Sequence, residues 1–198
     1  MILYINCCVR EESRTNKLAQ AVLQQIDGEI VELNLYKENL RSLDRETLVK
    51  RTALIEKEDF SSSMFDYAKQ FAAADEIVIA APYWDLSFPA MLKIYFENIY
   101  ITGLVSEYGE NGMPQGLCKA KRLIYVTTAG GPYDPTYSYG YVESLAKNFF
   151  GIPDTQLIKA EMLDVEGYDA EEILEKAIMQ INETLQDNQI KQQRRLTK

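Results

Sequence analysis

Histidine is absent from the 198 residues of this chain. A Ser-His-Asp triad, a Cys-His dyad and a histidine-ligated metal are therefore all excluded. Cysteine is scarce as well, because Cys7, Cys8 and Cys118 form neither an even-numbered framework nor a Cys-x-x-Cys pair. No disulfide scaffold is predicted, and we expect a cytoplasmic location. An enzyme without histidine would depend on a bound cofactor for its chemistry.

Basic residues are also few, since the chain has 21 Lys and Arg against 30 Asp and Glu, which gives a formal net charge of −9. Nucleic-acid binders need a basic face, so we expect no nucleic-acid partner. Residues 187–198 carry four basic side chains and one acid, which leaves about −12 on residues 1–186. We interpret residues 1–186 as one domain and residues 187–198 as a polar C-terminal tail.

Long apolar runs are missing too. No stretch approaches the length that spans a bilayer, so we expect no membrane partner. The first apolar run, Met1–Ile5, is too short for a signal peptide and no small-residue cleavage site follows it, so we expect no secretion signal.

Short apolar segments rich in β-branched residues alternate with longer segments of helical spacing. The predicted strands are Ile2–Asn6, Ile30–Leu35, Glu76–Ala81, Arg122–Thr128 and Gln156–Met162. The predicted helices are Arg14–Ile26, a segment around Met64–Ala72, Ala90–Ile99, Tyr141–Phe149 and Asp169–Leu185. The polar stretch Lys37–Ser63 is expected to form a helix or an excursion at the edge. This alternation predicts an α/β fold with a five-stranded parallel sheet and helices on both faces.

Five parallel strands commonly take the order 2-1-3-4-5, and ligands then bind beyond the carboxyl ends of strands 1 and 3. This rule selects three loops before any motif is considered: Cys7–Thr15, Pro82–Phe88 and Thr128–Gly140.

The first loop suits a phosphate, because Ser13 and Thr15 stand where hydroxyl and free N–H groups meet at a helix entrance. It contains neither Gly-x-Gly-x-x-Gly nor a Walker lysine, which argues against a dinucleotide Rossmann fold and a P-loop NTPase. An ordinary alternative is that Ser13 is an N-cap and Arg14 a solvated charge.

The other two loops suit a planar ring. Tyr83 and Trp84, the only tryptophan, supply aromatic surface, although a loop buried against a partner subunit would have the same composition. The pair Gly130–Gly131 directly follows a strand, where it allows the backbone close to a ligand and equally serves a tight turn.

Taken together, these residues resemble FMN-dependent NADH-azoreductases and NAD(P)H:quinone oxidoreductases of flavodoxin-like fold. The resemblance reaches from the first strand to about Leu185, and Glu12–Thr15, Pro82–Leu86, Pro89–Lys93, Tyr95–Glu97 and Thr127–Gly131 carry it. It implies FMN as cofactor, NADH or NADPH as donor, and a quinone, an azo compound or a similar planar molecule as acceptor. It also implies ping-pong hydride transfer in a homodimer, with subunit contacts from Tyr95–Tyr100 and Tyr133–Tyr141.

The resemblance assigns FMN contacts to all three loops. Cys8, Ser13, Arg14 and Thr15 would bind the phosphate; Tyr83, Trp84, Asp85 and Leu86 would pack on the ring; Thr128, Ala129, Gly130 and Gly131 would line its other side. Tyr133 is a candidate proton donor. Cys8 stands where serine is frequent in the family, which predicts weaker phosphate binding. Asp85 stands where asparagine is common, and its charge is expected to lower the flavin potential.

Two other functions fit the same residues. A flavodoxin-like carrier would cycle by single electrons with a protein partner, and the acidic composition suits it. Against a carrier stand the long connection Ile101–Lys119 and the Gly-Gly loop, which resemble the reductases. A chain that kept the fold and lost the flavin would act as a binding module.

Overall fold

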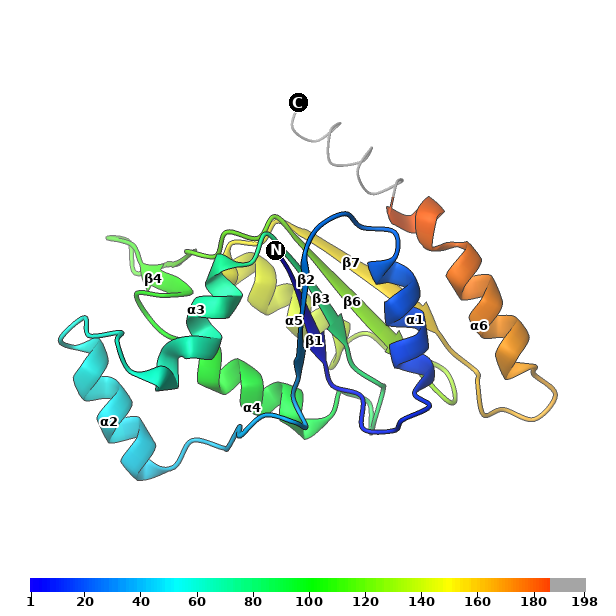
Figure 1. Ribbon diagram of the computed structural model, residues 1–198, viewed down its shortest axis with the longest axis horizontal. Coiled ribbons are helices and arrows are strands. Elements are labelled where there is room, and N and C mark those ends of the chain that lie inside the picture. The colour runs from blue at the N-terminus through cyan, green and yellow to red at the C-terminus, as the bar shows by residue number, and fades with distance from the viewer. Residues whose placement is uncertain (186–198) are drawn as a thin grey trace, which may run out of the picture.

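A five-stranded parallel sheet forms the middle layer of the computed structural model, which describes residues 1–185 (Figure 1). Its strands are β1 (Ile2–Asn6), β2 (Ile30–Asn34), β3 (Glu76–Ala80), β6 (Arg122–Thr128) and β7 (Asp154–Ala160). The order β2-β1-β3-β6-β7 confirms the predicted flavodoxin-like arrangement. The central strands form at apolar runs because both of their faces are covered, and every residue of β1 is buried.

Helices cover the two faces of this sheet, and their cores differ in composition. On one face lie α1 (Arg14–Leu23) and α6 (Ala170–Met179), over a core that is aliphatic apart from Tyr4 and Cys8. On the other face lie α3 (Asp66–Ala73), α4 (Ala90–Ile99) and α5 (Tyr139–Leu145), over a core rich in phenylalanine and tyrosine. Along β1 the residues alternate between the two cores, as the period of two in a strand requires.

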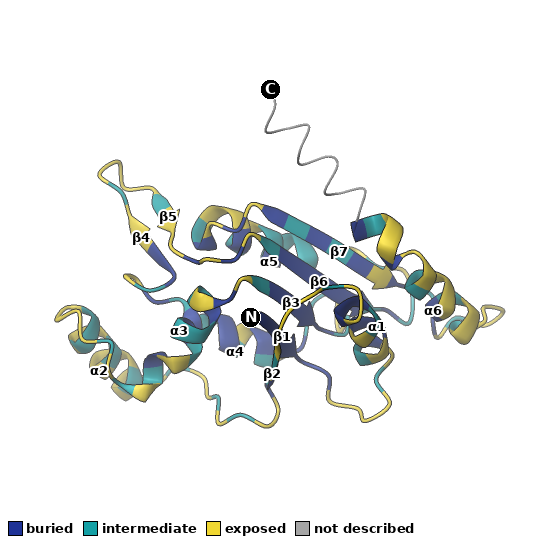
Figure 2. Cartoon of the chain, turned by 45° about the horizontal axis from the view of Figure 1, so that its top comes forward, coloured by how far each residue is buried: buried dark blue, intermediate teal, exposed yellow. Residues whose placement is uncertain are grey.

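The polar stretch 37–63 forms an excursion, as predicted. It contains α2 (Arg45–Ile55), a helix with no buried residue that lies at the far end of the molecule from α6 (Figure 2). A short 3₁₀ helix, Ser63–Phe65, leads from it into α3. No described helix is both long and apolar enough to cross a membrane.

One element was not predicted, a hairpin of β4 (Ser106–Tyr108) and β5 (Pro114–Gly116) in the connection after α4. Its return strand runs against the end of the helical segment Ala146–Phe150, a π-helix that continues α5. A Cβ atom on Gly116 would stand 2.0 Å from the backbone nitrogen of Gly151. Only glycine allows this approach of two backbones.

Several predicted boundaries were wrong. Strand β7 spans Asp154–Ala160 instead of Gln156–Met162, since Asp154 pairs with Arg122 and Met162 has a positive φ of 68° that ends the strand. Smaller shifts affect the other elements. Strands β2 and β3 each end one residue earlier than predicted, and α1 already ends at Leu23. Helix α3 starts after the 3₁₀ turn, α5 starts two residues early at Tyr139, and α6 ends at Met179, although residues 181–185 are again helical. The predicted tail, residues 187–198, lies outside the described residues.

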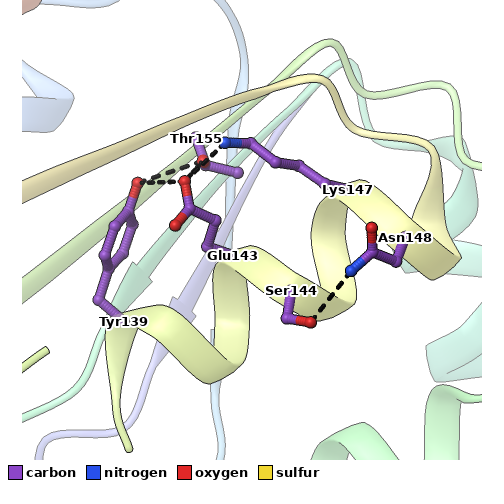
Figure 3. Close-up of polar contacts among 6 residues, drawn as sticks. All are labelled: Tyr139, Glu143, Ser144, Lys147, Asn148 and Thr155. Carbon is purple, nitrogen blue, oxygen red and sulfur yellow. Dashed lines mark hydrogen bonds and ion pairs between the residues drawn. The ribbon is translucent and has the colours of Figure 1, made fainter. Parts of the chain in front are cut away.

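Polar side chains fasten α5 to the edge strand β7 (Figure 3). The Glu143 carboxylate accepts hydrogen bonds from Lys147 Nζ at 2.6 Å and from Thr155 Oγ1 at 3.0 Å, and Tyr139 also donates to Thr155 at 3.1 Å. Burial raises the pKa of Glu143, but these hydrogen bonds outweigh burial and hold it below its ordinary value. Glu143 therefore stays ionised near neutral pH and keeps the start of α5 fixed beside the loop that precedes it.

Candidate functional site

A cavity of about 440 Å³ opens at the carboxyl edge of the sheet, beyond β1, β3 and β6. This is the place that the strand order selects for a ligand. Its volume lies within the range of about 300–1,000 Å³ that is usual for small-molecule sites. Three walls enclose it: the entrance of α1, the loop after β3, and the loop after β6 together with the segment after β7. We call this cavity the cleft.

The first wall is the entrance of α1. Ser13 caps the helix, because its Oγ accepts a hydrogen bond from the backbone of Asn16 at 3.2 Å. The backbone N–H groups of Arg14 and Thr15 precede the first intrahelical bond and face no helical acceptor. Thr15 is buried and its Oγ1 lies 2.6 Å from Thr128 Oγ1, so α1 and β6 are joined at the base of the cleft.

Arg14 reaches across the cleft, and its side chain remains 43% exposed. Its Nη1 donates to the carbonyl of Leu163 at 3.2 Å and to Asp164 Oδ1 at 2.9 Å. Both acceptors follow β7, 149 and 150 positions further along the chain. The guanidinium therefore ties the first wall to the third.

The second wall is aromatic and ends in a tight turn. Tyr83 and Trp84 line the cleft, and Trp84 remains 40% exposed. Trp84 and Ser87 exchange two backbone hydrogen bonds of 2.9 and 2.8 Å around Asp85 and Leu86. The φ angles of 49° and 67° at these two positions place both in the left-handed region. Such a conformation in a residue as large as leucine stores strain, which is typical of ligand-binding loops.

The third wall is two backbone segments held side by side. The amides of Met162, Leu163 and Asp164 donate to the carbonyls of Gly131, Ala129 and Gly130, in that order, over 2.9–3.2 Å. A Cβ atom on Gly130 would lie 2.4 Å from Asp164 Oδ2, so a larger residue there would displace that carboxylate. The positive φ of Met162 turns the chain so that Leu163 and Asp164 reach the cleft.

Tyr133 lies behind the second wall. Its hydroxyl is 2.8 Å from Ser138 Oγ, and its ring packs edge-on against Tyr83 with centroids 4.8 Å apart. Burial raises the pKa of its hydroxyl above the ordinary value. In this arrangement Tyr133 supports Tyr83, and its hydroxyl is directed to Ser138.

Cys8 lies under the cleft and is 7% exposed. Its backbone N–H donates to Asn6 Oδ1 at 2.9 Å. Burial raises the pKa of the thiol to about 11, so it is neutral near pH 7.

The structure brings most of the predicted site residues together and leaves some out. Those in the cleft wall are Ser13, Arg14, Thr15, Tyr83, Trp84, Thr128, Ala129 and Gly130. The cleft wall does not include Cys8, Asp85, Leu86, Gly131 or Tyr133. Asp85 and Leu86 are exposed in the turn, and Leu86 is 59% exposed to solvent.

Sequence reasoning missed Leu163 and Asp164, which line the cleft from the segment after β7. A signal for them existed, because the carboxyl ends of all parallel strands meet at one edge. The loop after the fifth strand therefore belonged with the three loops selected by the switch point.

Comparison with known proteins gives one family. A family model described as flavodoxin-like fold matches residues 1–185. A protein named FMN-dependent NADH:quinone oxidoreductase from Clostridium beijerinckii is 39% identical over 196 residues, which cover 92% of this chain and 96% of that protein. One with the same name from Clostridium perfringens strain ATCC 13124 is 37% identical over 187 residues, covering 89% and 93%.

A solved structure shares the architecture as well. The crystal structure of an FMN-dependent NADH-azoreductase from Bacillus anthracis, in complex with FMN, superposes with a TM-score of 0.76. The two chains are 26% identical, and the match covers 92% of this chain and 95% of that one.

Proposed function

The chain belongs to the flavodoxin-like fold family and, within it, to the FMN-dependent NADH:quinone oxidoreductases, and from this membership we propose that it binds FMN in the cleft and passes electrons from NADH to a quinone- or azo-type acceptor. FMN, when bound, supplies the hydride-accepting chemistry that a chain without histidine lacks.

The observation that carries the proposal is the division of the cleft into a phosphate end and a ring end. At one end stand the α1 entrance and Arg14; at the other stand Tyr83 and Trp84. A helix N-terminus with an arginine suits a phosphate, and aromatic surface suits a flat ring. The donor set therefore fits FMN, which has both parts.

The residues of this chain would bind and orient the ligand. The hydroxyl of Ser13 and the backbone amides of Arg14 and Thr15 would hold the phosphate. The backbone of Ala129–Gly130 would approach the ring, while the aromatic side chains of the second wall exclude water from its face. Asp85 and Leu86, in the strained turn, would meet the outer edge of the ring.

We further propose hydride transfer with ping-pong kinetics. With FMN in the cleft, donor and acceptor would reach it through the same opening, so the two would bind in turn. Initial rates at several fixed NADH concentrations should then give parallel double-reciprocal lines. Intersecting lines would contradict this order of events.

The test is reconstitution with FMN followed by desalting and anaerobic addition of NADH. A retained flavin absorbance that NADH bleaches directly, and that menadione or an azo dye restores, is the expected result. Bound flavin that NADH leaves unchanged would favour a one-electron carrier. If no flavin is retained, the remaining interpretation is a binding module that has lost the flavin.

A homodimer is part of the proposal and rests on a second hollow of about 430 Å³, which we call the groove and which is lined by α4, by α5 with its π-helical continuation, and by Leu43 and Arg51. Phe96, Tyr100, Tyr141 and Phe149 give it an aromatic lining. Of the residues predicted to make subunit contacts, four are buried, namely Tyr95, Phe96, Ile99 and Ser138, so the remaining ones would supply the surface. The free, buried thiols of all three cysteines suit the reducing cytoplasm.

A further inference from the structure

The ion pair between Arg14 and Asp164 crosses the phosphate end of the cleft. Arg14 begins α1, and Asp164 lies in the segment between β7 and α6, which runs beside the start of α1 (Figure 1). Both side chains line the cleft, and they remain 43% and 67% exposed. A ligand that enters this end therefore meets an arginine that already has a partner.

The charges of the cleft wall cancel. The basic residues are Arg10 and Arg14, and the acidic ones are Glu12 and Asp164. A phosphate dianion would add its charge to a wall with no surplus of positive charge. Arg10 has no ion pair among the described residues, whereas Arg14 is paired with Asp164, so a phosphate that approaches Arg14 has to compete with that carboxylate.

The backbone fixes the position of the Asp164 carboxylate. Its amide donates to the carbonyl of Gly130 at 2.9 Å, and the left-handed turn at Met162 directs the segment back to the cleft. Its Oδ2 stands over the Cα of Gly130, at the site that a Cβ atom would fill. The carboxylate thus lies over the loop that would carry the ligand.

We propose that Asp164 is a positioning residue that competes with the ligand phosphate for Arg14. In the free protein it holds the guanidinium across the phosphate end, and binding of a phosphorylated ligand exchanges this carboxylate for the phosphate. This inference rests on the proposed function, because it takes FMN as the ligand. It assigns Asp164 the role of weakening phosphate binding, which a merely structural ion pair would not have.

Two ligands and one matched control variant test the exchange. FMN and riboflavin share the ring and differ in the phosphate, so their dissociation constants are measured by quenching of flavin fluorescence in Asp164→Asn and in wild type. The control is Asp66→Asn, which breaks a single exposed pair with Lys69 on α3, where the carboxylate is 63% exposed. Thermal melts of the free proteins verify that both variants fold.

Asp164→Asn is expected to bind FMN about three- to fivefold more tightly, a change typical of removing one exposed like charge, and to bind riboflavin unchanged. Asp66→Asn should alter neither constant, and Asp164→Glu should bind FMN within about twofold of wild type.

Weaker or unchanged FMN binding in Asp164→Asn would overturn the inference alone, since wild type would still bind FMN. Equal tightening for FMN and riboflavin would also overturn it, because the effect would then act on the ring end. If wild type binds neither flavin, the proposed function fails and the inference fails with it.

Discussion

The cleft and the groove have nearly the same volume, about 440 and 430 Å³, and are built from different parts of the chain. Loops at strand ends form the cleft, where helix-entrance amides and left-handed residues lie near each other. The sides of helices form most of the groove, where the backbone is largely paired within the helices, and Leu43 and Tyr100 add to its lining from outside them. Volume therefore does not distinguish the cleft from the groove, whereas available backbone groups do.

The largest expected effect is on the free energy of unfolding, and it differs between two glycines, Gly116 near the groove and Gly131 beside the cleft. A Cβ atom at Gly116 would collide with the backbone of Gly151, next to the helical segment that lines the groove, whereas nothing lies within 4 Å of a Cβ at Gly131 beside the cleft. We expect Gly116→Ala to lower the free energy of unfolding by about 2–3 kcal/mol. Gly131→Ala should change it by less than about 0.5 kcal/mol. Urea denaturation measures both, and equal losses would contradict the close approach.

The next effect concerns the groove. Phe149 lines it and packs edge-on against Tyr100 with ring centroids 5.6 Å apart. Replacing Phe149 by Glu would put a charge on the proposed interface and should weaken the dimer by about 2 kcal/mol. The control is Asn148→Glu, at an exposed neighbour outside the groove lining. Sedimentation velocity reports the oligomeric state; if both variants sediment like wild type, the groove is not the interface.

A smaller effect is expected in the cleft. Trp84→Ala removes aromatic surface from the ring end and should weaken FMN binding by about tenfold, since stacking contributes about 1–3 kcal/mol per ring. The oligomeric state should not change. Tyr108→Ala, on an aromatic side chain of β4 that is 57% exposed, is the control for loss of aromatic area elsewhere. Equal FMN affinity in wild type and Trp84→Ala would remove the tryptophan from the site.

The smallest difference is expected between two buried thiols, Cys8 and Cys118. Burial raises the pKa of Cys8, under the cleft, to about 11 and that of Cys118, in the core cluster that includes Phe96, to about 12, from an ordinary value of 9. A pKa raised on folding contributes stability below pH 9, and this contribution is lost as the pH rises towards 11 and 12. Both thiols should resist Ellman's reagent at pH 8 in the native state and react in guanidinium. Fast labelling of Cys8 alone would indicate that the floor of the cleft opens.

The sheet was predictable because its central strands are buried on both faces, and that burial requires the unbroken apolar runs seen at Ile2–Ile5 and Ile77–Ala80. The β4–β5 hairpin was not predictable, since its three-residue strands include Pro114 and Gly116 and lack apolar alternation. The end of β7 was missed because Met162 gives no sign in the sequence of its left-handed conformation.

The site was predictable where a loop follows a strand, and less so where tertiary contacts decide. Ser13 and Thr15 lie at the helix entrance that the pattern indicated. Whether Asp85 faces a ligand depends on the turn at Asp85–Leu86, and Asp164, the partner of Arg14, lies 150 positions away in the sequence. Local sequence contains neither fact, because both arise from how separate strand ends meet.

The charge balance of the cleft also governs how fast an anion arrives. The formal charge of the chain is −9, and the charges of the basic and acidic residues of the cleft wall cancel. The protein therefore repels the anions FMN and NADH until they reach the α1 entrance. Salt shortens the range of this repulsion to about 8 Å at physiological ionic strength. Association with anionic ligands should therefore accelerate as salt is added, the reverse of the behaviour of an enzyme that steers its substrate inward.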